Sequence, residues 1–178
     1  MRRLAAVLIL AALSTAALAQ NVGSEAPDFT LVGLDGETIR LADYRGMPVV
    51  VNVWATWCRP CEAELPYFQR AADDLSDTVA LIMLNLGERP EVVSAFLEQR
   101  GLSLPVALTP SRGQAASLRA AGDAPDDSHS VARRYHVYGL PTTFLIDQRG
   151  VLAAQHVGPL DAVDLASLLA TVGVAWVP

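Results

Sequence analysis

Two nearly unbroken apolar runs flank a stretch in which apolar residues recur every three or four positions. Residues 47–54 and 78–86 have the composition of strands that helices cover on both faces of a sheet. The spacing between them predicts a helix over 59–75, which we expect Pro66 to kink. The residues expected on its buried face are Cys61, Leu65, Phe68, Ala72 and Leu75. The pattern therefore predicts a strand–helix–strand unit at the centre of the fold.

Further elements are predicted on both sides of this unit. Asp35-Gly36, between two apolar segments, indicates an N-terminal β-hairpin. The later elements expected are a helix over 90–100, a strand over 104–108, a helix over 130–137, strands over 142–146 and 151–157, and a final helix capped by Asp161. This order predicts an α/β fold with a central mixed sheet flanked by helices.

Two segments do not follow the pattern. Residues 109–128 are rich in Gly, Pro, Ser, Ala and Asp, and we expect an exposed, mobile excursion with a short helix around 114–120. The C-terminal residues 174–178 form a tail, in which Trp176 is either docked on the domain or exposed. We expect one domain over 20–178, because the sequence has neither internal repeats nor a linker that would divide it.

The N-terminal segment has the pattern of a secretory signal peptide. Arg2 and Arg3 precede an apolar stretch, and Ala17-Leu18-Ala19 supplies a small-x-small cleavage site. The stretch is shorter than the roughly 20 residues of a spanning helix. We therefore predict export to the periplasm or a similar compartment, with residues 1–19 removed. The alternative is a retained anchor that tethers the domain to the membrane.

The charge of the chain excludes two classes of partner. There is no lysine, and without Arg2 and Arg3 the chain has 11 basic and 19 acidic residues, a formal charge of −8. Such a chain is a poor candidate for binding nucleic acid or an anionic membrane surface. We expect a monomer that does not insert into the membrane once the signal is removed.

The only two cysteines, Cys58 and Cys61, follow the first apolar run at the expected start of a helix. In an exported protein a cysteine pair is by default structural. However, a disulfide that closes four residues stabilises the fold by only about 2 kcal/mol. Unpaired N–H groups at a helix start also favour a thiolate. The pattern predicts a redox-active disulfide. A zinc site needs about four ligands, and the scattered histidines do not complete such a set, so no metal and no other cofactor is expected.

Four sequence blocks, in this order, resemble the thioredoxin superfamily and, within it, the TlpA/ResA-like branch of exported thiol–disulfide oxidoreductases. The blocks are residues 26–29 (APDF), 54–61 (WATWCRPC), 64–66 (ELP) and 139–147 (GLPTTFLID). The resemblance covers roughly residues 23–172 and implies a thioredoxin-like fold, with 90–108 as the α-β insertion typical of this branch. Residues 109–128 are longer than the usual connection at that place.

The resemblance also implies roles for the site residues. Cys58 attacks a client disulfide, and Cys61 resolves the mixed disulfide. The Leu140–Pro141 bond is cis and lies beside the cysteines, where the Leu140 main chain pairs with the client. Trp57 packs beside the thiols as a lid or belongs to the core. Arg59 either favours the Cys58 thiolate or is an exposed arginine without a redox role.

The proton-handling group is expected after the cysteines. General thioredoxins have a buried aspartate six residues before the first cysteine, where this chain has Asn52. Glu64 lies three residues after Cys61, on the same helical face, and matches an acidic residue of the TlpA/ResA-like branch. Burial would raise its pKa and suit it to accept the Cys61 proton. Glu62 is the competing candidate, although we expect it to be a solvated acid of the first helical turn.

The resemblance implies an exported reductant, supplied with electrons by a membrane protein. Its clients would be proteins with cysteines, such as apocytochrome c, a copper-site protein or another envelope protein. One alternative is a peroxiredoxin-like thiol peroxidase, but such enzymes need a threonine three residues before the first cysteine, and this chain has Ala55. Another alternative is a redox-inactive binding module in which the disulfide only constrains the turn.

Overall fold

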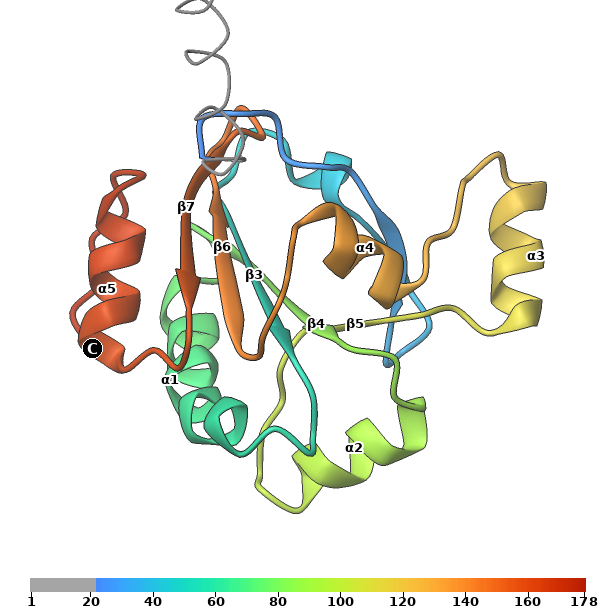
Figure 1. Cartoon of the computed structure of the whole chain (residues 1–178), viewed down its shortest axis with the longest axis horizontal. Helices are drawn as coiled ribbons and strands as arrows, with labels where there is room; N and C mark the ends of the chain where they lie inside the picture. Colours follow the sequence, from blue (N-terminus) through green and yellow to red (C-terminus); the bar gives the residue numbers. More distant parts are fainter. Residues whose placement is uncertain (1–21) are drawn as a thin grey trace, which may run out of the picture.

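A computed structural model describes residues 22–178, so the predicted signal peptide, residues 1–19, lies outside the described residues. Seven strands form one sheet in the order β2-β1-β5-β4-β3-β6-β7 (Figure 1). The strands are β1 Thr30–Gly33, β2 Thr38–Arg40, β3 Val49–Trp54, β4 Ala80–Asn85, β5 Val106–Leu108, β6 Thr142–Ile146 and β7 Leu152–Val157. The helices are the 3-10 helix η1 Leu41–Tyr44, α1 Arg59–Leu75, α2 Pro90–Glu98, α3 Arg112–Ala120, α4 Ser128–Arg134 and α5 Ala162–Ala170. Within residues 22–178, no helix combines the length and apolar character needed to span a bilayer.

The centre of the sheet is β3, in which every residue is buried. It pairs in parallel with β4 and antiparallel with β6, while β4 continues in parallel to β5. The N-terminal hairpin β1–β2 joins the other side of β5. The predicted α/β class is thus confirmed, with a mixed sheet, an N-terminal hairpin and an inserted α2–β5 unit.

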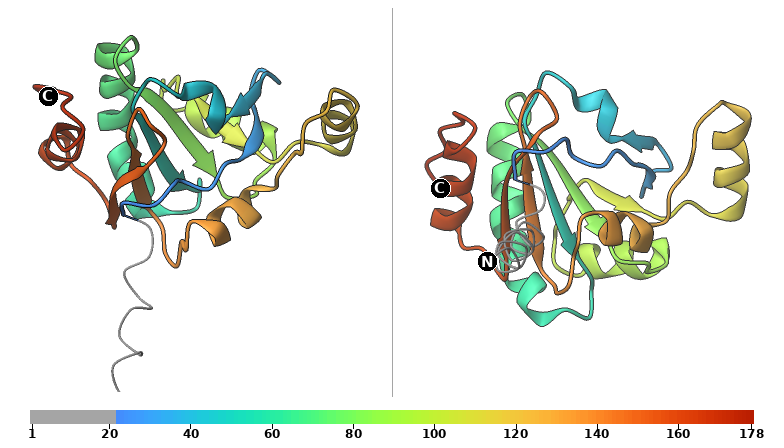
Figure 2. Two further views of the ribbon diagram at one scale, coloured as in Figure 1. Left: turned by 90° about the horizontal axis from the view of Figure 1, so that it is seen from above. Right: turned by 45° about the horizontal axis from the view of Figure 1, so that its top comes forward.

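Apolar side chains cover the sheet on both faces. One cluster joins α1, α2 and α5 to one face, and a second joins α4 and η1 to the other. Figure 2 shows α1 and α4 on opposite sides of the sheet. Helix α1 continues through Pro66, and its buried face differs from the prediction at one alanine: Ala71 is fully buried, whereas Ala72 is only partly so.

The segment 109–128 is more ordered than its composition suggests. Ser111 and Gln114 form a capping box that starts α3. Arg40 pairs with Asp123 through two hydrogen bonds. The Asp126 N–H donates to the Thr30 carbonyl, and the Thr30 N–H donates to Oδ2 of Asp126. Figures 1 and 2 show α3 at one edge of the domain. The predicted excursion therefore contains a helix fastened to the N-terminal hairpin.

Helix α4 begins and ends earlier than the sequence predicts. Asp127 caps it by accepting a hydrogen bond from the Ser130 N–H, which places its first residue at Ser128. It ends at Arg134 because His136 has a positive φ of 52°, which a right-handed helix cannot include.

The C-terminal tail is docked on α1. Asp161 caps α5 in a capping box, as predicted for its side chain. Beyond α5, the buried Trp176 donates a hydrogen bond from Nε1 to Oδ2 of Asp74, at 2.9 Å. Of the two alternatives for Trp176, the structure selects the docked one.

Replacing Trp176 tests how much this docking stabilises the fold. Trp176→Ala removes a buried indole and leaves a cavity, so we expect the free energy of unfolding to fall by about 3 kcal/mol. Urea denaturation measures the change. Val177→Ala is the matched control, because Val177 is exposed and its truncation should change stability by less than about 0.5 kcal/mol. Equal effects of the two substitutions would contradict the docking.

Candidate active site

The two cysteines lie where β3 turns into α1, and they are joined as a disulfide. Cys58 is the N-cap of α1, with Pro60 in the first turn, and its Sγ accepts a hydrogen bond from the Cys61 N–H at 3.3 Å. Cys58 is 5% exposed and Cys61 is 0% exposed. The same N–H and the positive end of the helix dipole would stabilise a thiolate on Cys58 after reduction.

Glu64 lies one turn after Cys61 and is only 1% exposed. Its Oε1 accepts a hydrogen bond from Asn52 Nδ2 at 2.7 Å, and its Oε2 accepts one from the Leu160 N–H at 2.9 Å. Burial raises the pKa of the Glu64 carboxyl to about 7, although both hydrogen bonds oppose the shift. A carboxyl group with this pKa can gain or lose a proton near neutral pH.

Glu62 has different surroundings. Its carboxylate forms an ion pair with Arg100 at 2.7 Å and is partly exposed. The structure thus places Glu64, and not Glu62, inside the core with the cysteines.

An apolar hollow of about 600 Å³ opens beside Cys58. The apolar side chains around it include Trp57, Leu86, Val137, Tyr138 and Leu140. Trp57 is 67% exposed, so it is not a core residue. Tyr138 is 92% exposed, and the sequence did not single it out. A hollow of this size can hold side chains of a client peptide next to the cysteine.

The Leu140–Pro141 peptide bond is cis. Leu140 lines the hollow, whereas Pro141 is buried and does not line it. Within residues 22–178, no group hydrogen-bonds to the N–H or C=O of Leu140. The Leu140 main chain can therefore accept an extended peptide as a new strand.

Glu88 is a further residue that the sequence did not reveal. Its carboxylate accepts hydrogen bonds from the N–H of Thr56, at 2.7 Å, and from the Thr56 hydroxyl. It also accepts one from Asn85 Nδ2 at 2.8 Å. Glu88 thereby fixes the loop that leads into Cys58. The sequence feature that could have indicated this role is the position of Glu88 just after β4, because the ends of the parallel strands β3 and β4 meet at one edge of the sheet.

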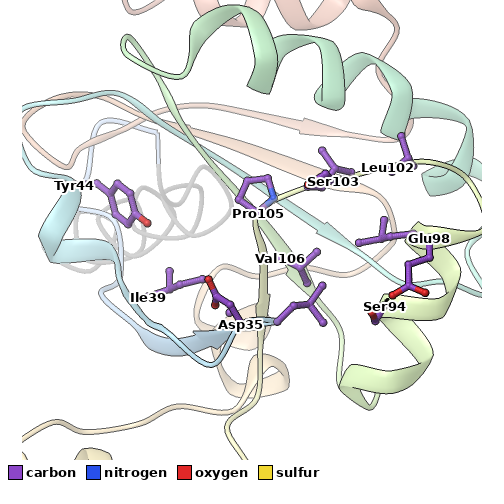
Figure 3. A pocket seen from close by; sticks show the side chains of 13 residues that line it. Asp35, Ile39, Tyr44, Ser94, Glu98, Leu102, Ser103, Pro105 and Val106 are labelled. Carbon is purple, nitrogen blue, oxygen red and sulfur yellow. Dashed lines mark hydrogen bonds between the residues drawn. The ribbon is translucent and has the colours of Figure 1, made fainter.

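A second hollow, of about 410 Å³, lies between the N-terminal hairpin, α2 and the segment before β5 (Figure 3). Its two acidic side chains already have partners, since Ser94 donates to Glu98 and the Glu37 N–H donates to Asp35. It shares no lining residue with the hollow at Cys58. Within the described part of the chain, no group of three or more potential metal ligands is found.

Known proteins resemble this chain in sequence and in structure. The sequence model of the AhpC/TSA family matches residues 22–155. The thiol-disulfide oxidoreductase ResA of Geobacillus thermodenitrificans is 35% identical over 181 residues, which cover 97% of this chain and 94% of the relative. A thio-disulfide isomerase from Thermus thermophilus superimposes with a TM-score of 0.67 at 27% identity, covering 88% of this chain and 99% of that protein. StoA from Bacillus subtilis superimposes with a TM-score of 0.59 at 27% identity, covering 79% and 94%.

These relationships agree with the geometry of the cysteine pair. The family match spans most of the chain, and the match to ResA includes nearly all of both proteins. The disulfide at the start of α1 is the chemical group that a thiol–disulfide oxidoreductase requires. The chain belongs to the AhpC/TSA family and, within the thioredoxin superfamily, to the ResA-like thiol–disulfide oxidoreductases.

Proposed function

We propose that this enzyme is an exported reductant of disulfides in client proteins. One observation carries the proposal: Cys58 borders an open apolar hollow, while Cys61 and Glu64 are buried behind it. In this arrangement Cys58 can attack a client disulfide, and Cys61 can resolve the mixed disulfide that forms.

The reaction begins with the reduced Cys58–Cys61 pair. The Cys58 thiolate attacks one sulfur of the client disulfide, so that a Cys58–client bond forms and the client S–S bond breaks. The second client sulfur leaves as a thiolate and takes up a proton. Trp57 and Leu140 hold the client segment during this step, with Pro141 buried behind Leu140.

The second step releases the client. Glu64, as a carboxylate, takes the proton of the Cys61 thiol, and the Cys61 thiolate attacks Sγ of Cys58. The enzyme disulfide forms, and the first client sulfur leaves as a thiolate. Two electrons have passed from the enzyme to the client, and a membrane electron donor must then reduce the enzyme disulfide.

The clients we propose are exported proteins whose cysteines must be reduced, such as apocytochrome c before haem attachment or a copper-site protein. The basic and apolar N-terminal segment supports export, because it has the composition of a signal peptide. A peroxidase is disfavoured, because Ala55 stands where that reaction needs a threonine hydroxyl.

A Cys61→Ser variant should accumulate mixed disulfides between Cys58 and its clients. Without the resolving thiol, the Cys58–client bond persists, so non-reducing electrophoresis of the exported fraction should show adducts that disappear with dithiothreitol. The adducts would show that Cys58 is the cysteine that bonds to the client. Mass spectrometry of the adducts would identify the clients.

Cys58→Ser is the control for this experiment, because it keeps one buried thiol but removes the attacking one. It should yield no adducts. Absence of adducts with both variants, or equal amounts with both, would contradict the proposed mechanism.

A further inference from the structure

Asn52, Thr143 and Glu64 form a buried polar cluster between the sheet and α1. Asn52 and Thr143 face each other on β3 and β6, and none of the three is more than 1% exposed. Asn52 Nδ2 donates to Glu64 Oε1 at 2.7 Å and to Thr143 Oγ1 at 3.0 Å. Within residues 22–178, Oδ1 of Asn52 has no hydrogen-bond partner. An unpartnered buried amide oxygen is unusual and calls for a physical reason.

The second oxygen of Glu64 limits where a proton can bind. Oε2 accepts a hydrogen bond from the Leu160 N–H. A main-chain N–H can only donate, so Oε2 must remain an acceptor whether Glu64 is charged or neutral. The carbonyl oxygen of a neutral carboxyl group is a better acceptor than its hydroxyl oxygen, so the Leu160 N–H favours a proton on Oε1, the oxygen that faces Asn52. In that state Nδ2 would direct its hydrogen at an O–H group that needs an acceptor.

We propose that Asn52, supported by Thr143, is a positioning residue that holds Glu64 in both protonation states by reversing its hydrogen bonds. With Glu64 charged, Nδ2 of Asn52 donates to Oε1, as the structure shows. With Glu64 protonated, the Asn52 amide turns over, and Oδ1 accepts a hydrogen bond from the Oε1–H group. The Thr143 hydroxyl, which can accept or donate, rotates and donates to the same Oδ1. The turn exchanges the two bonds of Nδ2 for two bonds of Oδ1, which has no bond to lose.

This inference rests on the proposed role of Glu64 as the acceptor of the Cys61 proton. It also gives a physical reason for asparagine at position 52. A charged aspartate there could accept a hydrogen bond from protonated Glu64, but it could not donate one to the Glu64 carboxylate. An amide can serve both states, whereas a carboxylate cannot.

Other titratable groups surround the cluster and must be separated from Glu64. On α1 the nearest is the Cys61 thiol, which the disulfide form lacks. On β7, His156 lies directly opposite Thr143, on the same face of the sheet. In the loop before α5, Asp161 directs Oδ1 to the Asp164 N–H of its own helix. His156 is therefore the neighbouring side chain that needs a control.

An NMR titration of the disulfide form from pH 5 to 9 tests the inference. With labelled Glu carboxyl and Asn side-chain amide groups, the Glu64 carbon and the Asn52 amide should shift with one common midpoint. In Glu64→Gln the Asn52 signals should be flat across this range. His156→Gln should leave the common midpoint of Asn52 and Glu64 in place. The inference is overturned if Glu64 titrates while the Asn52 amide does not respond, or if that response disappears in His156→Gln.

Substitution of Asn52 supplies a second measurement. Asn52→Leu removes the Asn52 hydrogen bond from both protonation states of Glu64. The bond to the carboxylate is charge-assisted and is the stronger of the two, so the Glu64 midpoint should rise by about one pH unit. Asn52→Asp keeps the shape of the side chain and should also raise the midpoint, through like charge and the lost donor. An unchanged midpoint in both variants would overturn the inference. If Asn52 follows Glu64 but Glu64→Gln exchanges disulfides as fast as the wild type, the inference stands and the proposed catalytic role of Glu64 fails.

Discussion

A Cys58→Ser variant is expected to lose protein-disulfide reduction by at least about a thousandfold, as enzymes do when their nucleophile is removed. Cys58 is the cysteine that borders the apolar hollow, and its Sγ accepts a hydrogen bond from the Cys61 N–H. The remaining thiol, Cys61, is fully buried, so a client disulfide cannot reach it. Insulin reduction, followed as turbidity, measures the loss.

The loss should not come from unfolding. Serine is also a favourable N-cap residue, so α1 keeps a cap when Cys58 is replaced. The missing disulfide closes only four residues and contributes about 2 kcal/mol on the chain-entropy model. The variant should therefore unfold at the same urea concentration as the reduced wild type. Activity of Cys58→Ser within tenfold of the wild type would instead identify Cys61 as the attacking cysteine.

Local sequence patterns were sufficient for the centre of the fold. The apolar runs predicted β3 and β4 within two residues at each end, because a strand covered on both faces is apolar at nearly every position, with Asn52 and Asn85 as the exceptions. The start of α1 at Arg59 follows from the preceding loop and from Pro60, which suits a first helical turn. The helical spacing also placed Glu64 on the face that carries Cys61.

The environment of Glu64 could not be predicted from local patterns. Its partner Leu160 lies 96 residues away and uses only its main-chain N–H, which no side-chain motif announces. Tyr138 was missed for a similar reason, because only the folded loop before β6 places it beside Cys58. Contacts of this kind depend on how distant segments meet in the sheet.

The misplaced helix limits near α3 and α4 have a different cause. Their signals were local, since Ser111 and Asp127 are N-cap residues three positions before the N–H groups they bind. The composition of residues 109–128, rich in turn-forming residues, outweighed these caps in the prediction. The two N-cap residues by themselves predict both helix starts correctly.

Glu64→Gln should slow disulfide exchange at pH 8 by roughly a hundredfold, the low end of general acid–base effects. In the wild type the pKa of Glu64 is about 7, so the carboxylate that takes the Cys61 proton is formed as the pH rises through 7. At pH 5 the wild-type carboxyl is itself protonated, and the two proteins should differ little. Single-turnover release of client from the mixed disulfide measures this step.

The same group should make stability depend on pH in a defined direction. Burial raises the pKa of Glu64 from 4.5 to about 7, so between these values the folded protein holds a proton that the unfolded chain has lost. The contribution of this proton to the free energy of unfolding is complete below pH 4.5. It is lost as the pH rises through 7, a change of roughly 3 kcal/mol. Glu64→Gln cannot lose this proton, so urea denaturation at pH 5 and pH 8 should show a smaller decrease for the variant.

Glu62→Gln is the matched control, because it removes a carboxylate from the same helical turn at a partly exposed site. It should keep both the wild-type pH profile of client release and the wild-type decrease of stability. A kinetic loss at pH 8 in Glu62→Gln, with Glu64→Gln unaffected, would transfer the proton-accepting role to Glu62. If neither variant releases client more slowly at pH 8, water is the acceptor of the Cys61 proton. Because Glu64 and Glu62 differ chiefly in burial, only the buried carboxyl should affect both kinetics and stability over the same pH range.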